Sequence, residues 1–80
     1  MIPETPALVL DCRGKPCPLP VIELAKHLTD VEVGELIAVD SDDVAAAIDI
    51  PAWCRMREQE FVGHESAEDG VPRYFVRRVG

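Results

Sequence analysis

The stretch Asp11-Cys12-Arg13-Gly14-Lys15-Pro16-Cys17-Pro18-Leu19-Pro20 decides how the chain begins to fold. It follows a short apolar run at residues 7–10 that is typical of a buried strand. Prolines suit the first turn of a helix, where backbone N–H groups have no helical partner. We therefore predict a loop over 11–16 and a helix with Cys17 at its N-cap and Pro18 at its first position. Its apolar stripe has the helical spacing i, i+3, i+4, i+7: Val21, Leu24, Ala25 and Leu28.

A second strand and a second helix are predicted at residues 36–39 and about 44–58. The polar run at residues 41–43 provides N-cap side chains for this helix. Pro51 lies inside the helical pattern, and because proline lacks an N–H we expect a kink or a restart there. The apolar face of the helix is expected to carry Val44, Ala47 and Ile48.

Two apolar segments near the C-terminus, residues 61–62 and 74–76, are typical of strands, and Asp69-Gly70 predicts a hairpin between them. The element order is then β-α-β-α-β-β. We expect both helices on one face of a four-stranded mixed sheet, because the first crossover should be right-handed and the chain is too short to form a third layer. We therefore predict an α/β (α+β) two-layer sandwich, formed as a single domain over residues 1–80, with the other sheet face open.

Charge and composition exclude several classes of protein. Lys and Arg number 8 against 15 Asp and Glu, and a net charge of -7 disfavours nucleic acid and anionic membranes as partners. No apolar run approaches the roughly 20 residues of a membrane span, and the start of the chain lacks the pattern of a signal peptide. With 3 cysteines and no export signal, we expect reduced thiols and a cytoplasmic location.

Cys17 is the candidate reactive residue. A helix N-terminus carries about half a positive charge, which favours thiolate, and Arg13 and Lys15 add cations in the same loop. The helix dipole contributes only roughly 0.3–1 kcal/mol, and Pro18 and Pro20 remove two amides that could face the sulfur. We therefore expect a mild lowering of the Cys17 pKa.

The pattern Asp11-x-x-Gly14-x-x-Cys17-Pro18-x-Pro20 resembles the signature of the TusA/SirA family of small sulfur carriers. The resemblance covers nearly the whole chain, including the segments Asp49-Ile50-Pro51-x-x-Cys54 and Tyr74-Phe75-Val76-Arg77. It implies the two-layer fold and a persulfide carried on Cys17. The residues expected to support that cysteine are Arg13, Gly14, Lys15, Pro18 and Pro20.

The same resemblance implies the partners. Sulfur donors would be cysteine desulfurases or rhodanese-like proteins, and acceptor proteins would belong to tRNA thiolation, cofactor biosynthesis or sulfur metabolism. It implies a component of a sulfurtransferase relay without a cofactor, in place of a stand-alone enzyme.

The other two cysteines leave alternatives open. Cys12 follows a strand end and is expected either to fill space or to act as an auxiliary thiol that resolves a Cys17 persulfide. Cys54 lies beside Trp53 and Met56 and is predicted to be structural. A zinc site is disfavoured because the gap between Cys12 and Cys17 stretches the usual ligand spacing and there is no second close pair. The alternative functions are a thiol redox protein using Cys12 and Cys17, and a regulatory interaction domain using the open sheet face.

Overall fold

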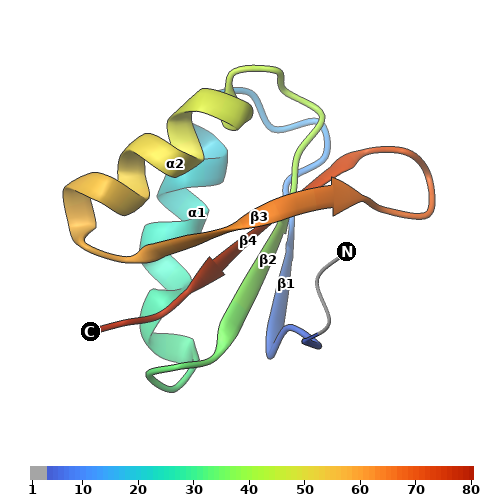
Figure 1. The fold of residues 1–80 in the computed structure, drawn as a ribbon. Coiled ribbons are helices and arrows are strands. Elements are labelled where there is room, and N and C mark those ends of the chain that lie inside the picture. The colour runs from blue at the N-terminus through green and yellow to red at the C-terminus, as the bar shows by residue number, and fades with distance from the viewer. Residues whose placement is uncertain (1–3) are drawn as a thin grey trace.

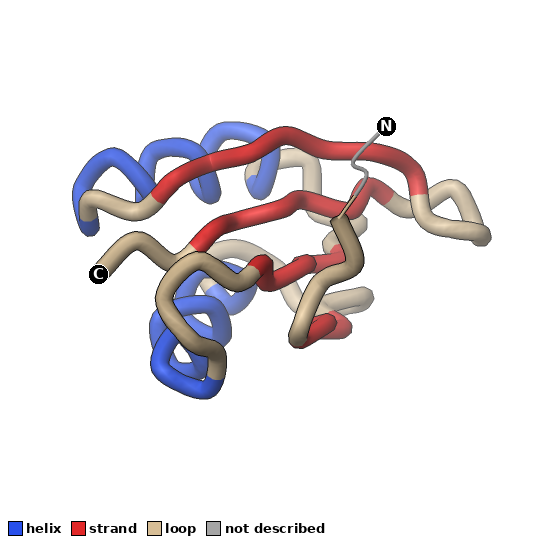
Figure 2. The backbone as a smooth tube through the Cα atoms, turned by 60° about the horizontal axis from the view of Figure 1, so that its bottom comes forward, coloured by secondary structure: helices blue, strands red, loops and turns tan. Residues whose placement is uncertain are grey.

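The computed structural model describes residues 4–80 and has two layers, a four-stranded sheet and two α-helices against it (Figures 1 and 2). The predicted domain includes residues 1–3, and the expectation of no signal peptide also concerns them. These three residues lie outside the part of the chain that the structure describes. The elements are β1 (Leu8–Asp11), α1 (Leu19–His27), a 3-10 turn η1 (Leu28–Asp30), β2 (Leu36–Asp40), α2 (Ala46–Arg57), β3 (Glu60–Ser66) and β4 (Pro72–Arg77). The predicted element order is confirmed.

The sheet is mixed, with strand order β1-β2-β4-β3. β1 pairs parallel to β2, while β4 pairs antiparallel to both β2 and β3. Because β1 and β2 are parallel, their carboxyl ends meet at one edge of the sheet, and the loops that lead into α1 and α2 start side by side (Figure 1). This edge positions the candidate site.

The main core lies between the sheet and both helices, as predicted. Inward-facing strand residues alternate along the chain, as a strand requires, and they pack against buried residues of α1 and α2. The core includes Leu10, Leu24, Leu28, Ile37, Val39, Ile50, Trp53, Tyr74 and Val76. Leu36, Ala38 and Phe75 alternate with these on the opposite face and are also buried, so the predicted open face carries a small apolar cluster of its own.

The start of α1 differs by one residue from the prediction. Pro18, and not Cys17, is the N-cap, because its carbonyl accepts the first helical hydrogen bond, from the N–H of Ile22 at 3.0 Å. Pro20 then lies in the first turn, where its missing N–H costs nothing. Cys17 therefore precedes the helix and belongs to the loop.

The buried face of α2 also differs from the prediction. Val44 and Ile48 are 88% and 73% exposed, and the face that packs on the sheet carries Ala46, Ile50, Trp53 and Cys54. Pro51 lies within one continuous helix, so the predicted restart does not occur. Apolar residues occur on several sides of α2, so the sequence pattern alone did not select the face that packs.

Candidate functional site

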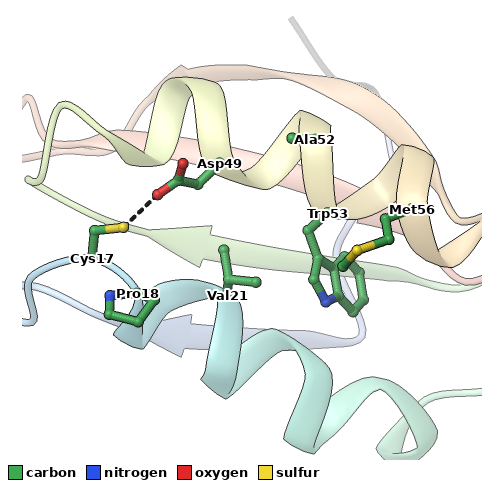
Figure 3. Close-up of a pocket in the computed structure, with 7 residues that line it drawn as sticks. All are labelled: Cys17, Pro18, Val21, Asp49, Ala52, Trp53 and Met56. Carbon is green, nitrogen blue, oxygen red and sulfur yellow. Dashed lines mark hydrogen bonds between the residues drawn. The ribbon is translucent and has the colours of Figure 1, made fainter.

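Cys17 lies at one end of an apolar groove between α1 and α2 (Figure 3). The groove has a volume of about 340 Å³ and is lined by Cys17, Pro18, Val21, Asp49, Ala52, Trp53 and Met56. Cys17 is exposed, whereas the indole of Trp53 is almost wholly buried at the floor and Met56 is mostly exposed. An exposed thiol beside an apolar hollow is available both to small molecules and to a docked protein.

Two aspartates from the loop before α2 hold the cysteine loop in place. The backbone N–H of Cys17 donates to Oδ2 of Asp43 at 2.8 Å, and the N–H of Gly14 donates to both carboxylate oxygens of Asp42 at 3.1 and 3.2 Å. Gly14 has φ +74°, a left-handed conformation that favours glycine. The loop conformation is therefore determined by a glycine in the sequence and by carboxylates from another element.

The sulfur itself contacts a third aspartate. Cys17 Sγ donates a hydrogen bond to Oδ2 of Asp49, which projects from α2 (Figure 3). This hydrogen bond raises the pKa of Cys17, and partial desolvation and the charges of Asp49 and Asp43 add to the effect. The expected mild lowering of the pKa is therefore wrong. The carboxylates of Asp49 and Asp43 favour the thiol over the thiolate.

Arg13 does not serve the thiol as predicted. Its guanidinium donates to Asp69 at 2.7 and 3.1 Å, to Asp11 at 3.0 Å and to the buried Asp40 at 3.3 Å. These bonds fasten the loop after β1 to the turn between β3 and β4, and they raise the pKa of Arg13. Arg13, which was predicted to lie beside the sulfur as a cation, instead binds these three aspartates.

Lys15 is likewise directed elsewhere. Its Nζ lies 3.9 Å from Oε1 of Glu23 on α1. Because both cations of the loop pair with carboxylates, the charges that act on Cys17 are those of Asp43 and Asp49. The prediction that Arg13 and Lys15 activate the thiol is not supported by this arrangement.

The other cysteines lie away from the groove. Cys12 and Cys54 are free thiols buried in the core, at 0% and 1% exposure. Burial raises the pKa of Cys12 and raises that of Cys54 to about 11. The structural assignment of Cys54 agrees with its burial, and the space-filling reading of Cys12 is favoured over an auxiliary or redox role.

Within residues 4–80, no group of three or more His, Cys, Asp or Glu side chains is arranged to hold a metal ion. No helix in the same part of the chain is long and apolar enough to cross a membrane.

Most residues that line the groove were not among the predicted site residues. Asp49, Ala52, Trp53 and Met56 recur at the helical spacing i, i+3, i+4, i+7, a signal that could have placed them on one face of α2. A carboxylate at the head of an otherwise apolar stripe marks the side that faces Cys17. The predicted N-cap role of the polar run at residues 41–43 is wrong, because the N-cap of α2 is Ala45 and no side chain caps the helix. Asp43 instead accepts hydrogen bonds from the N–H groups of Ala45 and Cys17 in the two neighbouring loops.

The two-layer fold and the exposed cysteine before α1 define a small thiol protein of the α+β class. The sequence model of the family described as Sulfurtransferase TusA matches residues 8–78. The chain therefore belongs to the TusA family.

Individual relatives agree with this assignment. A protein of Archaeoglobus fulgidus named "Putative sulfur carrier protein" is 44% identical over 70 residues, which cover 88% of this chain and 91% of that protein. The "Putative sulfur carrier protein YrkF" of Bacillus subtilis is 33% identical over 73 residues, 91% of this chain and only 39% of the longer relative. The crystal structure of a SirA-like protein from Desulfitobacterium hafniense has a TM-score of 0.76 at 20% identity, over 91% of this chain and 99% of that one, and shows the same fold.

Proposed function

We propose that this protein is a sulfur carrier that holds a sulfane sulfur as a persulfide on Cys17. The observation that carries the proposal is that Cys17 is the exposed member of the three free cysteines and lies at the end of a groove, in a chain of the TusA family. Cys12 and Cys54 are enclosed by the core and cannot meet a donor without unfolding. The names of the relatives support the same role.

The transfer is an exchange that balances without a cofactor. Sγ of Cys17, as thiolate, attacks the terminal sulfur of a donor persulfide. A bond forms between Sγ and that sulfur while the donor S–S bond breaks. The donor leaves as thiolate and takes up the proton that Cys17 has lost, so one thiol and one persulfide exchange identities. Delivery to an acceptor thiol repeats the same step in reverse.

The proposal includes a donor and an acceptor protein. Cysteine desulfurases or rhodanese-like proteins would supply the sulfur in the cytoplasm, and acceptors in tRNA thiolation, cofactor biosynthesis or sulfur metabolism would receive it. The net charge of -7 favours partners with a basic docking surface. Such association should weaken as salt concentration rises.

The test is intact mass spectrometry after incubation with a cysteine desulfurase and cysteine, or with a rhodanese and thiosulfate. We expect a gain of one sulfur atom that reductant removes, absent in Cys17→Ser and retained in the matched control Cys12→Ser. Peptide mapping then locates the sulfur. Sulfur bound mainly to Cys54, or equal loading of Cys17→Ser, would refute the proposal.

A further inference from the structure

The contact between Cys17 and Asp49 joins two elements that meet only in the folded protein. Asp49 projects from α2 toward the sulfur, and beyond this pair the groove is apolar, lined by Val21, Ala52 and Trp53 (Figure 3). The carboxylate is the hydrogen-bond acceptor for Sγ, so it determines where the sulfur lies relative to the groove.

We propose that Asp49 is a positioning residue that holds Sγ of Cys17 at the end of the groove as a thiol, until a partner protein presents a cation that pairs with the carboxylate. This inference rests on the proposed function, because it concerns the state of the carrier between its partners. It assigns to Asp49 the control of when the sulfur becomes a nucleophile.

The charged groups around the sulfur support this assignment. Asp49 contacts the sulfur from α2, and Asp43 accepts a hydrogen bond from the backbone N–H of Cys17 from the loop before α2. Lys15, in the same loop as Cys17, is paired with Glu23 of α1. Loss of the thiol proton removes the donor of the hydrogen bond and sets a thiolate against a carboxylate, two like charges in contact. The free protein therefore stabilises the thiol, the form that resists alkylation and oxidation.

A docked cation reverses this balance. A guanidinium or ammonium group beside Asp49 forms a charge-assisted pair with the carboxylate and withdraws it from Sγ. The same positive charge stabilises the thiolate. Cys17 then gives up its proton, which the departing donor thiolate takes up in the exchange described above. The partner chemistry that fits this surface is a basic side chain next to an apolar one that enters the groove.

The experiment measures the rate of Cys17 alkylation by iodoacetamide against pH, with no donor or acceptor present. We expect Asp49→Asn to react at least about threefold faster near neutral pH, with a lower midpoint, because the thiolate fraction changes about tenfold per unit of pKa. Asp49→Glu keeps an acceptor carboxylate and should stay close to the slow profile. Glu68→Gln removes an equal charge from the turn between β3 and β4 and is the matched control.

Thermal unfolding of each variant verifies that it is folded. If Asp49→Asn does not fold, Asp49→Ser replaces it, because serine is also uncharged and small. An alkylation profile of the neutral variant that superimposes on that of the unaltered protein would overturn the inference. Failure of this inference is distinguishable from failure of the proposed function. The alkylation experiment involves no sulfur transfer, whereas persulfide loading is measured separately by mass spectrometry.

Discussion

The backbone N–H of Cys17 donates a 2.8 Å hydrogen bond to Oδ2 of Asp43, while Oδ1 of the same carboxylate accepts from the N–H of Ala45 at 2.8 Å. One side chain thus holds the loop that carries Cys17 and begins the turn into α2. The two hydrogen bonds lower the pKa of Asp43, so the carboxylate is charged throughout the neutral range. The loops after the parallel strands β1 and β2 are joined through this residue.

Replacing Asp43 with alanine should slow persulfide loading of Cys17. The variant frees the N–H of Cys17 and lets the loop move, and we expect this effect to outweigh the gain in thiolate from removing the Asp43 charge. The expected reduction in loading rate is roughly threefold to tenfold, below the about 100-fold that a 1 Å misplacement can cost. Time-resolved mass spectrometry with a desulfurase measures the rate. Asp42→Ala, which frees Gly14 instead, is the control and should have the smaller effect. Unchanged loading in Asp43→Ala would show that the loop needs no anchor.

Cys17 should be alkylated in the native protein while Cys12 and Cys54 are protected. The latter two are enclosed by the core, and burial raises the pKa of both, so little thiolate is present to react. Brief labelling followed by peptide mapping should find label on Cys17 alone, and on all three cysteines after addition of denaturant. Native labelling of Cys54 at a rate similar to that of Cys17 would contradict the buried placement.

Removal of the buried carboxylate of Asp40 should destabilise the fold. Asp40 binds Arg73 through two hydrogen bonds, at 2.6 and 2.9 Å, and its side chain is 2% exposed. Asp40→Ala leaves Arg73 and Arg13 without that partner. Breaking a buried pair costs about 3–5 kcal/mol, and here about 2–3 kcal/mol is expected because both arginines can still reach water.

Urea unfolding of Asp40→Ala measures this loss of stability. Asp11→Ala is the matched control, since the carboxylate of Asp11 binds the same Arg13 but is largely exposed. We expect little change from it. Equal stability of the two variants would mean that burial of Asp40 contributes nothing.

Stability should also depend on pH through Asp69. Hydrogen bonds from Arg13 and from the N–H of Val71 lower the pKa of Asp69 from 3.8 to about 2. Because the folded-state pKa is the lower one, this contribution is complete above the ordinary value and is lost as pH falls from 3.8 toward 2. Thermal unfolding between neutral pH and pH 2 should therefore show a shallower acid limb in Asp69→Asn. If stability falls equally steeply with decreasing pH in the unaltered protein and in Asp69→Asn, Asp69 does not contribute to the acid dependence.

The fold was predictable where local pattern and chain order suffice. Alternating strands and helices followed by a hairpin require a mixed sheet with its helices on one face, because crossover handedness leaves few alternatives. Details that depend on packing were not predictable. Val44 and Ile48 have helical spacing as good as that of Ile50 and Trp53, and only contact with the sheet selected the latter pair.

The sequence by itself placed Cys17 in an exposed loop, because Gly14, Cys17 and the flanking prolines lie together and their constraints are local. Tertiary structure decided the electrostatic environment of that residue. Asp43 and Asp49 lie 26 and 32 positions from Cys17 along the chain, yet pairing of β1 with β2 and packing of α2 beside α1 bring both to it. Charges act through distance in space, so the nearest cations in sequence, Arg13 and Lys15, gave the wrong sign for the Cys17 pKa shift.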